Sequence, residues 1–308
     1  MPAGFINALD WAFGDGANDD AAALSQAAAA AQADGKHLWV PGTADSYDVG
    51  AQVAIPAGVS VKSWGRLRAL AGIPRTAPVV VVGASGTANP FQVIEIALDN
   101  AGAADWAHAG FVGVRLYNPQ NCLIDIRQVK GTTVGVEIIA DGGHAAMNNE
   151  IRLGLLEDCR WAVQLTGPVR DNRLMLGRWS VAHTADVEKA LWKIEGTSAT
   201  GNLWISPSAA GVHRPAGAAR KLSYLHTQSP MNQIWSLGDD AALAVASGDA
   251  HIVADGAAAE HNLVRIGRYR DSQALTVARI NGAPAGRNGL ITRRAEAQNQ
   301  NVIGGIVV

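Results

Sequence analysis

The 308-residue sequence predicts an all-β solenoid whose first coil is covered by an N-terminal α-helix. Short strand-like segments that begin at asparagine recur about every 30 residues, and a second series of short strands falls between them. An alanine-rich segment with one apolar face precedes the first strands. Repeats of this length that hold only short strands are typical of a β-solenoid, in which each coil packs on its neighbours.

The N-terminal stretch FGDGANDDAAALSQAAAAAQADGKHLWVPG, residues 13–42, predicts the helix and the strand after it. Residues 18–20 supply N-cap side chains and negative charge at the helix start. We expect a helix over residues 19–33, with Gly35 in the left-handed conformation after its end. HLWV then reads as a strand closed by a Pro-Gly turn. The residues that share the apolar face of the helix are Leu24, Ala27, Ala28 and Ala31.

The body of the chain carries the repeat. Asparagine begins NEIRLG, NRLMLG, NLWIS, NQIWSLG and NLVRIG at positions 149, 172, 202, 232 and 262. Asn121 fits this register poorly, because it would turn Asp125 inward, and we expect a one-residue slip in that coil. The second series is GVEIIADG, AVQLTG, LWKIEG, LSYLHT, HIVADG and LTVARING. We expect Gly177, Gly238 and Gly267 where strands turn corners.

Alternation within these strands assigns their faces. The second and fourth residues after asparagine are mostly apolar and are expected to face the core, with the asparagines forming an inward ladder between coils. The pattern gives an N-terminal cap over residues 1–50, about eight coils over residues 51–282, and a C-terminal cap or oligomerisation tail over residues 283–308. The outward residues of the second series form a polar row, typical of a sugar groove, whereas the first series mixes apolar groups with arginines, as a subunit interface would.

The N-terminal segment resembles the signature of the pectate-lyase-like family, which is common in phage tailspikes. The matching residues are 13–16, Asp19-Asp20, the strand end 39–42 and the segment 59–63. The chain departs from that signature at Trp11-Ala12, where the family usually has an acidic residue. The resemblance implies a right-handed parallel β-helix capped by the helix, a polysaccharide substrate, a homotrimer and an extracellular or virion-associated location.

Composition limits the partners. The net charge of −2 and the 17% of charged residues indicate no nucleic-acid partner, and no apolar run reaches the ~18 residues of a membrane helix. Cys122 and Cys159 are expected to be small buried side chains rather than a disulfide framework or a zinc site. The histidines lack the spacing of metal ligands, and no cofactor motif is present, so the sequence predicts neither a metal nor a cofactor.

Glycan cleavage requires either two carboxylates about 5 to 9 Å apart or a base beside a group that neutralises a sugar carboxylate. Residues 160–196 concentrate such side chains, including His183, Asp186 and Glu188. Lys193 and Glu195 share one face of a strand, so the sequence is as consistent with a local ion pair as with an acid–base site. The candidate catalytic residues are Glu195, Asp171, Lys193 and Asp158. The candidate substrate-binding residues are Arg173, Trp192, Trp235, His226 and Glu137.

Three functions follow from these observations. The first is a tailspike-like protein that binds and depolymerises a bacterial surface polysaccharide, by hydrolysis or by elimination. The second is a non-catalytic glycan-binding spike or receptor-binding module, with other virion proteins as further partners. The third is a stand-alone microbial polysaccharide lyase, although the acidic calcium cluster expected of a pectate-type lyase is not evident.

Overall fold

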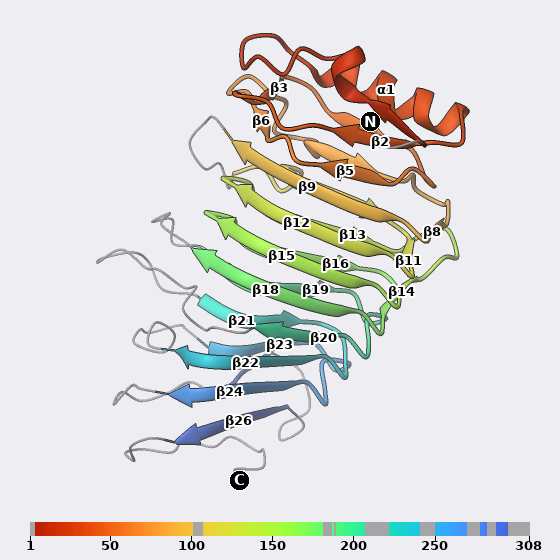
Figure 1. Ribbon diagram of the computed structural model, residues 1–308. Helices are drawn as coiled ribbons and strands as arrows, with labels where there is room; N and C mark the ends of the chain where they lie inside the picture. The colour runs from red at the N-terminus through yellow and green to blue at the C-terminus, as the bar shows by residue number, and fades with distance from the viewer. Residues whose placement is uncertain are drawn as a thin grey trace.

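The computed structural model describes residues 4–100, 107–180, 187, 189–206, 222–240, 250–269, 278–281 and 288–294. Within these residues the chain is an all-β parallel solenoid of about seven turns with one α-helix near the N-terminus. Figure 1 shows helix α1 (Ala21–Ala33) at one end and the strands stacked below it as successive rungs. The fold class that the sequence predicts is confirmed.

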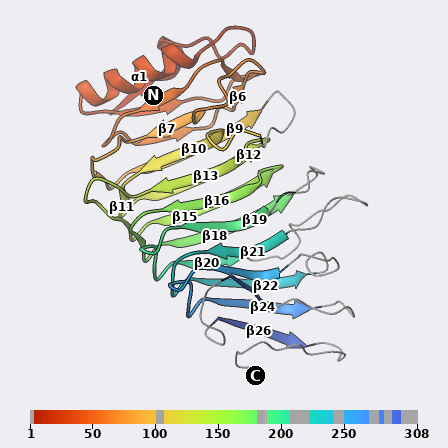
Figure 2. The same cartoon turned by 180° about the vertical axis from the view of Figure 1, so that it is seen from behind.

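The described strands form three parallel sheets along the solenoid. Sheet A has 13 strands: β1 (Phe5–Asn7), β2 (His37–Val40), β3 (Tyr47–Val49), β5 (Val61–Ser63), β6 (Leu67–Ala69), β9 (Val93–Asn100), β12 (Leu123–Lys130), β15 (Glu150–Glu157), β18 (Arg173–Ser180), β20 (Leu203–Ser206), β22 (Gln233–Asp240), β24 (Leu263–Tyr269) and β26 (Gly289–Arg294). Sheet B has nine: β4 (Val53–Ile55), β7 (Val80–Val82), β10 (Val112–Tyr117), β13 (Val134–Ile139), β16 (Trp161–Thr166), β19 (Lys189–Glu195), β21 (Leu222–Thr227), β23 (Ala250–Asp255) and β25 (Ala278–Asn281). Sheet C has four short ones: β8 (Asn89–Pro90), β11 (Pro119–Gln120), β14 (Ala146–Met147) and β17 (Val169–Arg170). Figure 2 shows the strands of sheet B from the opposite side.

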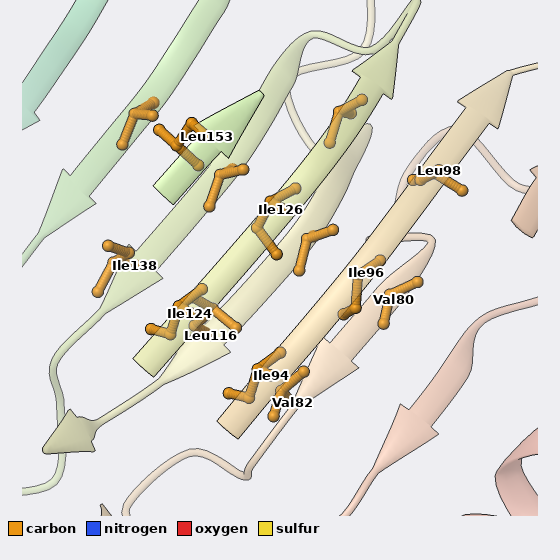
Figure 3. Close-up of a cluster of buried hydrophobic side chains, with 14 of the residues drawn as sticks. Val80, Val82, Ile94, Ile96, Leu98, Leu116, Ile124, Ile126, Ile138 and Leu153 are labelled. Atoms are coloured by element: carbon orange, nitrogen blue, oxygen red, sulfur yellow. The ribbon is translucent and has the colours of Figure 1, made fainter. Parts of the chain in front are cut away.

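The core lies between sheets A and B. Figure 3 shows Ile94 and Ile96 of β9 beside Val82 and Val80 of β7, and all four side chains are buried. Equivalent aliphatic residues repeat in each following coil because the strands pair in parallel register. Burying each such side chain stabilises the fold by about 1.5–3 kcal/mol, so the stack of aliphatic rows is the main source of stability.

The asparagine ladder is present at the bend between sheets C and A. The side chain of Asn149 donates to Asn172 at 2.7 Å, Asn172 donates to Asn202 at 2.9 Å, and Asn202 donates to Asn232 at 3.0 Å. The ladder continues to Asn262 and Asn288. All six asparagines are buried.

The expected slip at Asn121 is also confirmed. Cys122, not Asn121, occupies the ladder position, and its N–H donates to the Oδ1 atom of Asn149 at 2.9 Å. Asn121 instead has a φ of 55°, the left-handed conformation that the residues before the ladder asparagines 149, 172, 202, 232 and 262 also adopt. Asn148 occupies this bend position in the next coil and Asp171 occupies it in the coil after that, each with a φ of 55°. Asparagine and aspartate tolerate this conformation better than most residues, which explains their use there.

Helix α1 covers the first coils with its predicted face. Leu24, Ala27, Ala28 and Ala31 are buried, and Gly35 has a φ of 62° after the helix end. The helix begins at residue 21 rather than 19, because the side chains of Asp19 and Asp20 before it accept hydrogen bonds from backbone N–H groups of nearby segments. Asp19 accepts from the N–H of Ala21 and from that of Gly50, both at 3.0 Å. The buried Asp20 accepts from residues 13 and 14, which ties the preceding loop to the helix.

The three glycines expected at corners lie inside strands. Gly177 does not close its strand, because β18 continues to Ser180; glycine is required there since a Cβ would lie 2.7 Å from the carbonyl oxygen of Gly154. Gly238 and Gly267 likewise fall inside β22 and β24. Of the C-terminal tail over residues 283–308, the described part is residues 288–294, which add Asn288 to the ladder and β26 to sheet A. The remainder of the predicted tail lies outside the described residues.

Candidate functional site

The outer face of sheet B carries a row of polar side chains, one from each of five successive coils. Parallel register places Arg115 of β10 beside Glu137 of β13, then Gln164 of β16, Lys193 of β19 and His226 of β21. Adjacent coils are ~4.8 Å apart, so residues far apart in sequence become neighbours. We call these five residues the polar row. Four of its members, Glu137, Gln164, Lys193 and His226, are outward positions of the predicted second strand series, and Arg115 lies on the strand before that series.

A small apolar cluster lies beside the polar row: Val112, Val134, Trp161 and Ala190. It is separate from the main core because two consecutive residues face inward near the start of these strands. A Cβ on Gly113, for example, would meet core Val129, so residue 113 faces inward and Val112 faces outward. In the same way Ala162 and Val163 both belong to the main core, so Trp161 lies on the outer face.

The carboxylates of Glu137 and Glu195 lie close together at the polar row, on either side of the Gln164 amide. Glu137 accepts from the Nε atom of Arg115 at 2.6 Å, and Glu195, at the end of β19, pairs with Lys193. The amide nitrogen of Gln164 lies 3.3 Å from Oε1 of Glu137 and 3.1 Å from Oε2 of Glu195. These two carboxylate oxygens are therefore within about 6.5 Å of each other, which is compatible with the ~5–9.5 Å separation of carboxyl groups in glycoside hydrolases.

The two carboxylates have different environments. Glu137 is 6% exposed, whereas the side chain of Glu195 is 40% exposed. Burial raises the pKa of Glu137, and the charge of Glu195 adds to this effect, while Arg115 and Lys193 oppose it. Glu137 consequently holds a proton to higher pH than an ordinary glutamate, and the pair combines a protonatable acid with a more exposed carboxylate.

His226, the last member of the polar row, lies next to Trp161 of the apolar cluster. The Nε2 atom of His226 lies 2.5 Å from Oδ2 of Asp255, and its ring meets the edge of Trp161 at a centroid distance of 5.8 Å. The Nζ atom of Lys193 is 4.8 Å from the Trp161 ring centroid, and the guanidinium of Arg160 is 4.6 Å from it. Since Trp161 is only 5% exposed, it orients these cations rather than offering an open stacking surface.

The structure thus brings four of the nine predicted site residues together: Glu137, Lys193, Glu195 and His226. Arg173 and Trp235 lie on the opposite flank, on the outer face of sheet A, where Arg265 is 5.7 Å from the Trp235 ring. Asp158 and Asp171 occupy bends with φ values of 51° and 55°, at the end of β15 and just before β18.

Trp192 requires a correction. It is fully buried and packs against Trp204 in the core, with 5.5 Å between ring centroids, so it is not available to stack on a surface sugar. Lys193 and Glu195 of the same strand face outward. Because side chains alternate along a strand, Trp192, which precedes Lys193, faces the core. His183, Asp186 and Glu188, which the sequence grouped with these candidates, lie outside the described residues.

Two members of the site were not among the predicted site residues: Arg115 and Gln164. Gln164 was visible in the sequence as an outward residue of the second series. Its contact with Glu195, however, runs diagonally between coils and depends on the register that the loops impose. Within the described part of the chain, no group of three or more His, Cys, Asp or Glu side chains is arranged to hold a metal ion.

A second surface feature lies on sheet A. Asp125, Arg152 and Met175 line a shallow depression of about 400 Å³ above Gly154 and Gly177. Arg152 is engaged by Glu150 of the same strand at 2.6 Å. The depression has no paired carboxylates comparable with Glu137 and Glu195 among the residues that line it.

Comparison with known proteins supports the fold. No protein-family model matches the sequence, and no curated protein matches it. A solved structure of ORF18 from Geobacillus virus E2 is similar, with a TM-score of 0.50 and 12% sequence identity over 95% of this chain. This chain spans 62% of the length of that viral protein. At this identity the likeness shows the solenoid fold alone.

None of the described helices is long and apolar enough to span a membrane.

Proposed function

We propose that this chain is part of a virion spike that binds a bacterial surface polysaccharide and hydrolyses it at the Glu137–Glu195 pair. The observation that carries the proposal is this pair of carboxylates, held on one outer flank in two different environments. The similarity of fold to a viral protein and the N-terminal resemblance to tailspike-associated proteins support the virion context.

The chemistry follows from the two environments. Glu137, whose pKa burial raises, gives its proton to the glycosidic oxygen as the bond from that oxygen to the anomeric carbon breaks. In an inverting course, a water oxygen bonds to the anomeric carbon and Glu195 takes the water proton. In a retaining course, Glu195 bonds to that carbon first; a water oxygen then displaces Glu195 from the carbon while Glu137 takes the water proton. Elimination is less well supported, because the cations nearest the pair, Arg115 and Lys193, already neutralise Glu137 and Glu195.

Subunit assembly is the second part of the proposal. The outer face of sheet A presents apolar side chains and arginines in adjacent coils, the mixture expected of a subunit interface. A homotrimer packed through sheet A would leave sheet B free for a glycan. Light scattering of the purified protein tests this: a trimer agrees with the arrangement, and a monomer at micromolar concentration contradicts it. The face includes Met175, Leu203, Ile205, Trp235 and Arg265.

The test of hydrolysis is the release of new reducing ends from a panel of capsular polysaccharides, with ultraviolet absorbance measured in parallel to detect an unsaturated uronate. The proposal expects reducing ends without that absorbance. Glu195→Gln and Glu137→Gln should each reduce the rate at least ~100-fold while retaining glycan binding. Glu150→Gln is the matched control, because Glu150 is also half exposed and ion-paired, but lies on sheet A. Unchanged cleavage by both variants contradicts the assignment.

A non-catalytic glycan-binding module is the second candidate. One observation favours it: each carboxylate of the pair is already bound by a cation, and the Gln164 amide lies between them. Binding to a polysaccharide in the panel without any cleavage, at any pH, is the result that selects this function over hydrolysis.

A further inference from the structure

We propose that Gln164 is a positioning residue, whose side-chain amide keeps Glu137 and Glu195 apart as two separately held carboxylates and sets the pH range in which the pair works. The inference rests on the proposed function for its catalytic meaning. Its structural content concerns the pair itself and can be tested without a substrate.

The first argument is the placement of Gln164. It is 7% exposed and lies in the polar row between Glu137 and Lys193. One side-chain amide group carries two N–H donors, so Gln164 can satisfy both carboxylates at once. The reverse orientation would direct the amide oxygen at two carboxylate oxygens and place acceptors against acceptors, so the chemistry of the site fixes the amide nitrogen toward the pair.

The second argument is the division of the four carboxylate oxygens. Arg115 binds Oε2 of Glu137, and Lys193 binds Oε1 of Glu195, so the cations hold the outer oxygens. Gln164 binds the remaining two, Oε1 of Glu137 and Oε2 of Glu195. The amide nitrogen of Gln164 therefore bridges these two oxygens and fixes the separation of the two carboxylates.

The third argument is electrostatic. Two carboxylates this close in a half-buried site tend to share a proton, and one of them then ionises only at higher pH. An N–H donated to a carboxylate favours its charged form, so Gln164 opposes both the mutual repulsion and the burial of Glu137. The other charged or titratable groups that face the pair are Arg115 and Tyr117 on β10, Lys193 on β19, and the His226–Asp255 contact between β21 and β23.

Gln164→Met tests the proposal, because methionine keeps the length of the side chain but has no donor. Glutamate side chains labelled with ¹³C are titrated by NMR in the folded protein without substrate, with Glu137→Gln and Glu195→Gln used to assign the signals. We expect the pKa of Glu137 to rise by about one unit in Gln164→Met, the size expected for loss of one hydrogen bond to a charged group. A Glu137 pKa unchanged within experimental error overturns the proposal.

Two controls separate positioning from a general structural role. Gln120→Met removes a glutamine whose amide donates to the carbonyl oxygen of Ala145 in the sheet C corner, and it should leave both glutamate signals unmoved. Equal shifts in the two variants also contradict the proposal. If Gln164→Met does not fold, Gln164→Leu carries the same expectation.

Activity supplies an independent measurement. Once a cleaved polysaccharide is known, the alkaline limb of the kcat/KM profile, which reports protonated Glu137, should move to higher pH in Gln164→Met by the shift seen in the titration. A protein that cleaves no glycan but shows the NMR shift refutes the proposed hydrolysis and leaves the role of Gln164 intact. A protein that cleaves glycan, with no NMR shift in Gln164→Met, refutes only the positioning role.

Discussion

Replacing Asn149 by alanine removes three side-chain hydrogen bonds from the ladder. Its Oδ1 atom accepts from the N–H of Cys122 at 2.9 Å, and its amide donates to Pro119 O at 2.9 Å and to Asn172 at 2.7 Å. The variant leaves the Cys122 N–H and the Pro119 carbonyl buried without a partner. At about 1–3 kcal/mol for each orphaned group, the expected loss in the free energy of unfolding is about 3 kcal/mol.

Urea unfolding followed by circular dichroism measures this loss, and amide exchange at Cys122 should accelerate in parallel. The neighbouring exposed residue supplies the control: Asn148 has a φ of 55°, which glycine adopts freely, and Asn148→Gly leaves the ladder intact. The control should lie within a few tenths of a kcal/mol of the wild type. If Asn149→Ala is as stable as Asn148→Gly, the ladder does not stabilise the solenoid as argued.

Three further predictions concern single sites. Gly167→Ala should lower the free energy of unfolding by more than about 2 kcal/mol, because the new Cβ would lie 2.0 Å from the carbonyl oxygen of Ala140. Gly196 has a similar positive φ but open space around it, so Gly196→Ala should cost less. Equal urea midpoints for the two variants would contradict this. Burial raises the pKa of Cys159 to about 11, so its thiol should not react with an aromatic disulfide reagent at pH 8 until the chain unfolds, and fast labelling of the native protein at this position would contradict its burial. Because burial raises the pKa of Glu137 above its ordinary value of 4.5, the folded chain binds this proton more tightly than the unfolded chain. The stability of the wild type relative to Glu137→Gln should therefore fall as pH rises from about 4.5 through the raised pKa, and a flat or rising difference would contradict the shift.

The repeat was readable from the sequence because the ladder position demands a particular side chain. The asparagine side chain supplies both a donor and an acceptor, so it recurs in six successive coils from Asn149 to Asn288 and marks the bend. Asn121 shows the limit of this signal. The residue before the ladder adopts a left-handed conformation that also favours asparagine, and only the parity of the following strand distinguishes the two positions.

The candidate site was readable only in part. Alternation placed Glu137, Gln164 and Lys193 on one outer flank, since each occupies the equivalent position in its strand of the second series. It could not place Trp161, because the next two residues, Ala162 and Val163, both face the core and break the alternation at that point. Nor could it give the Gln164–Glu195 contact, which joins neighbouring coils along a diagonal and depends on how loops of unequal length set the register.

The proposed function requires a glycan to bind along the outer flank of sheet B, over the polar row. The decisive measurement is a crystal structure of Glu195→Gln with an oligosaccharide from a bound polysaccharide. We expect sugar density across β13, β16 and β19, with a glycosidic oxygen within hydrogen-bond distance of Glu137. Density confined to the depression on sheet A beside Asp125 and Met175 would contradict it.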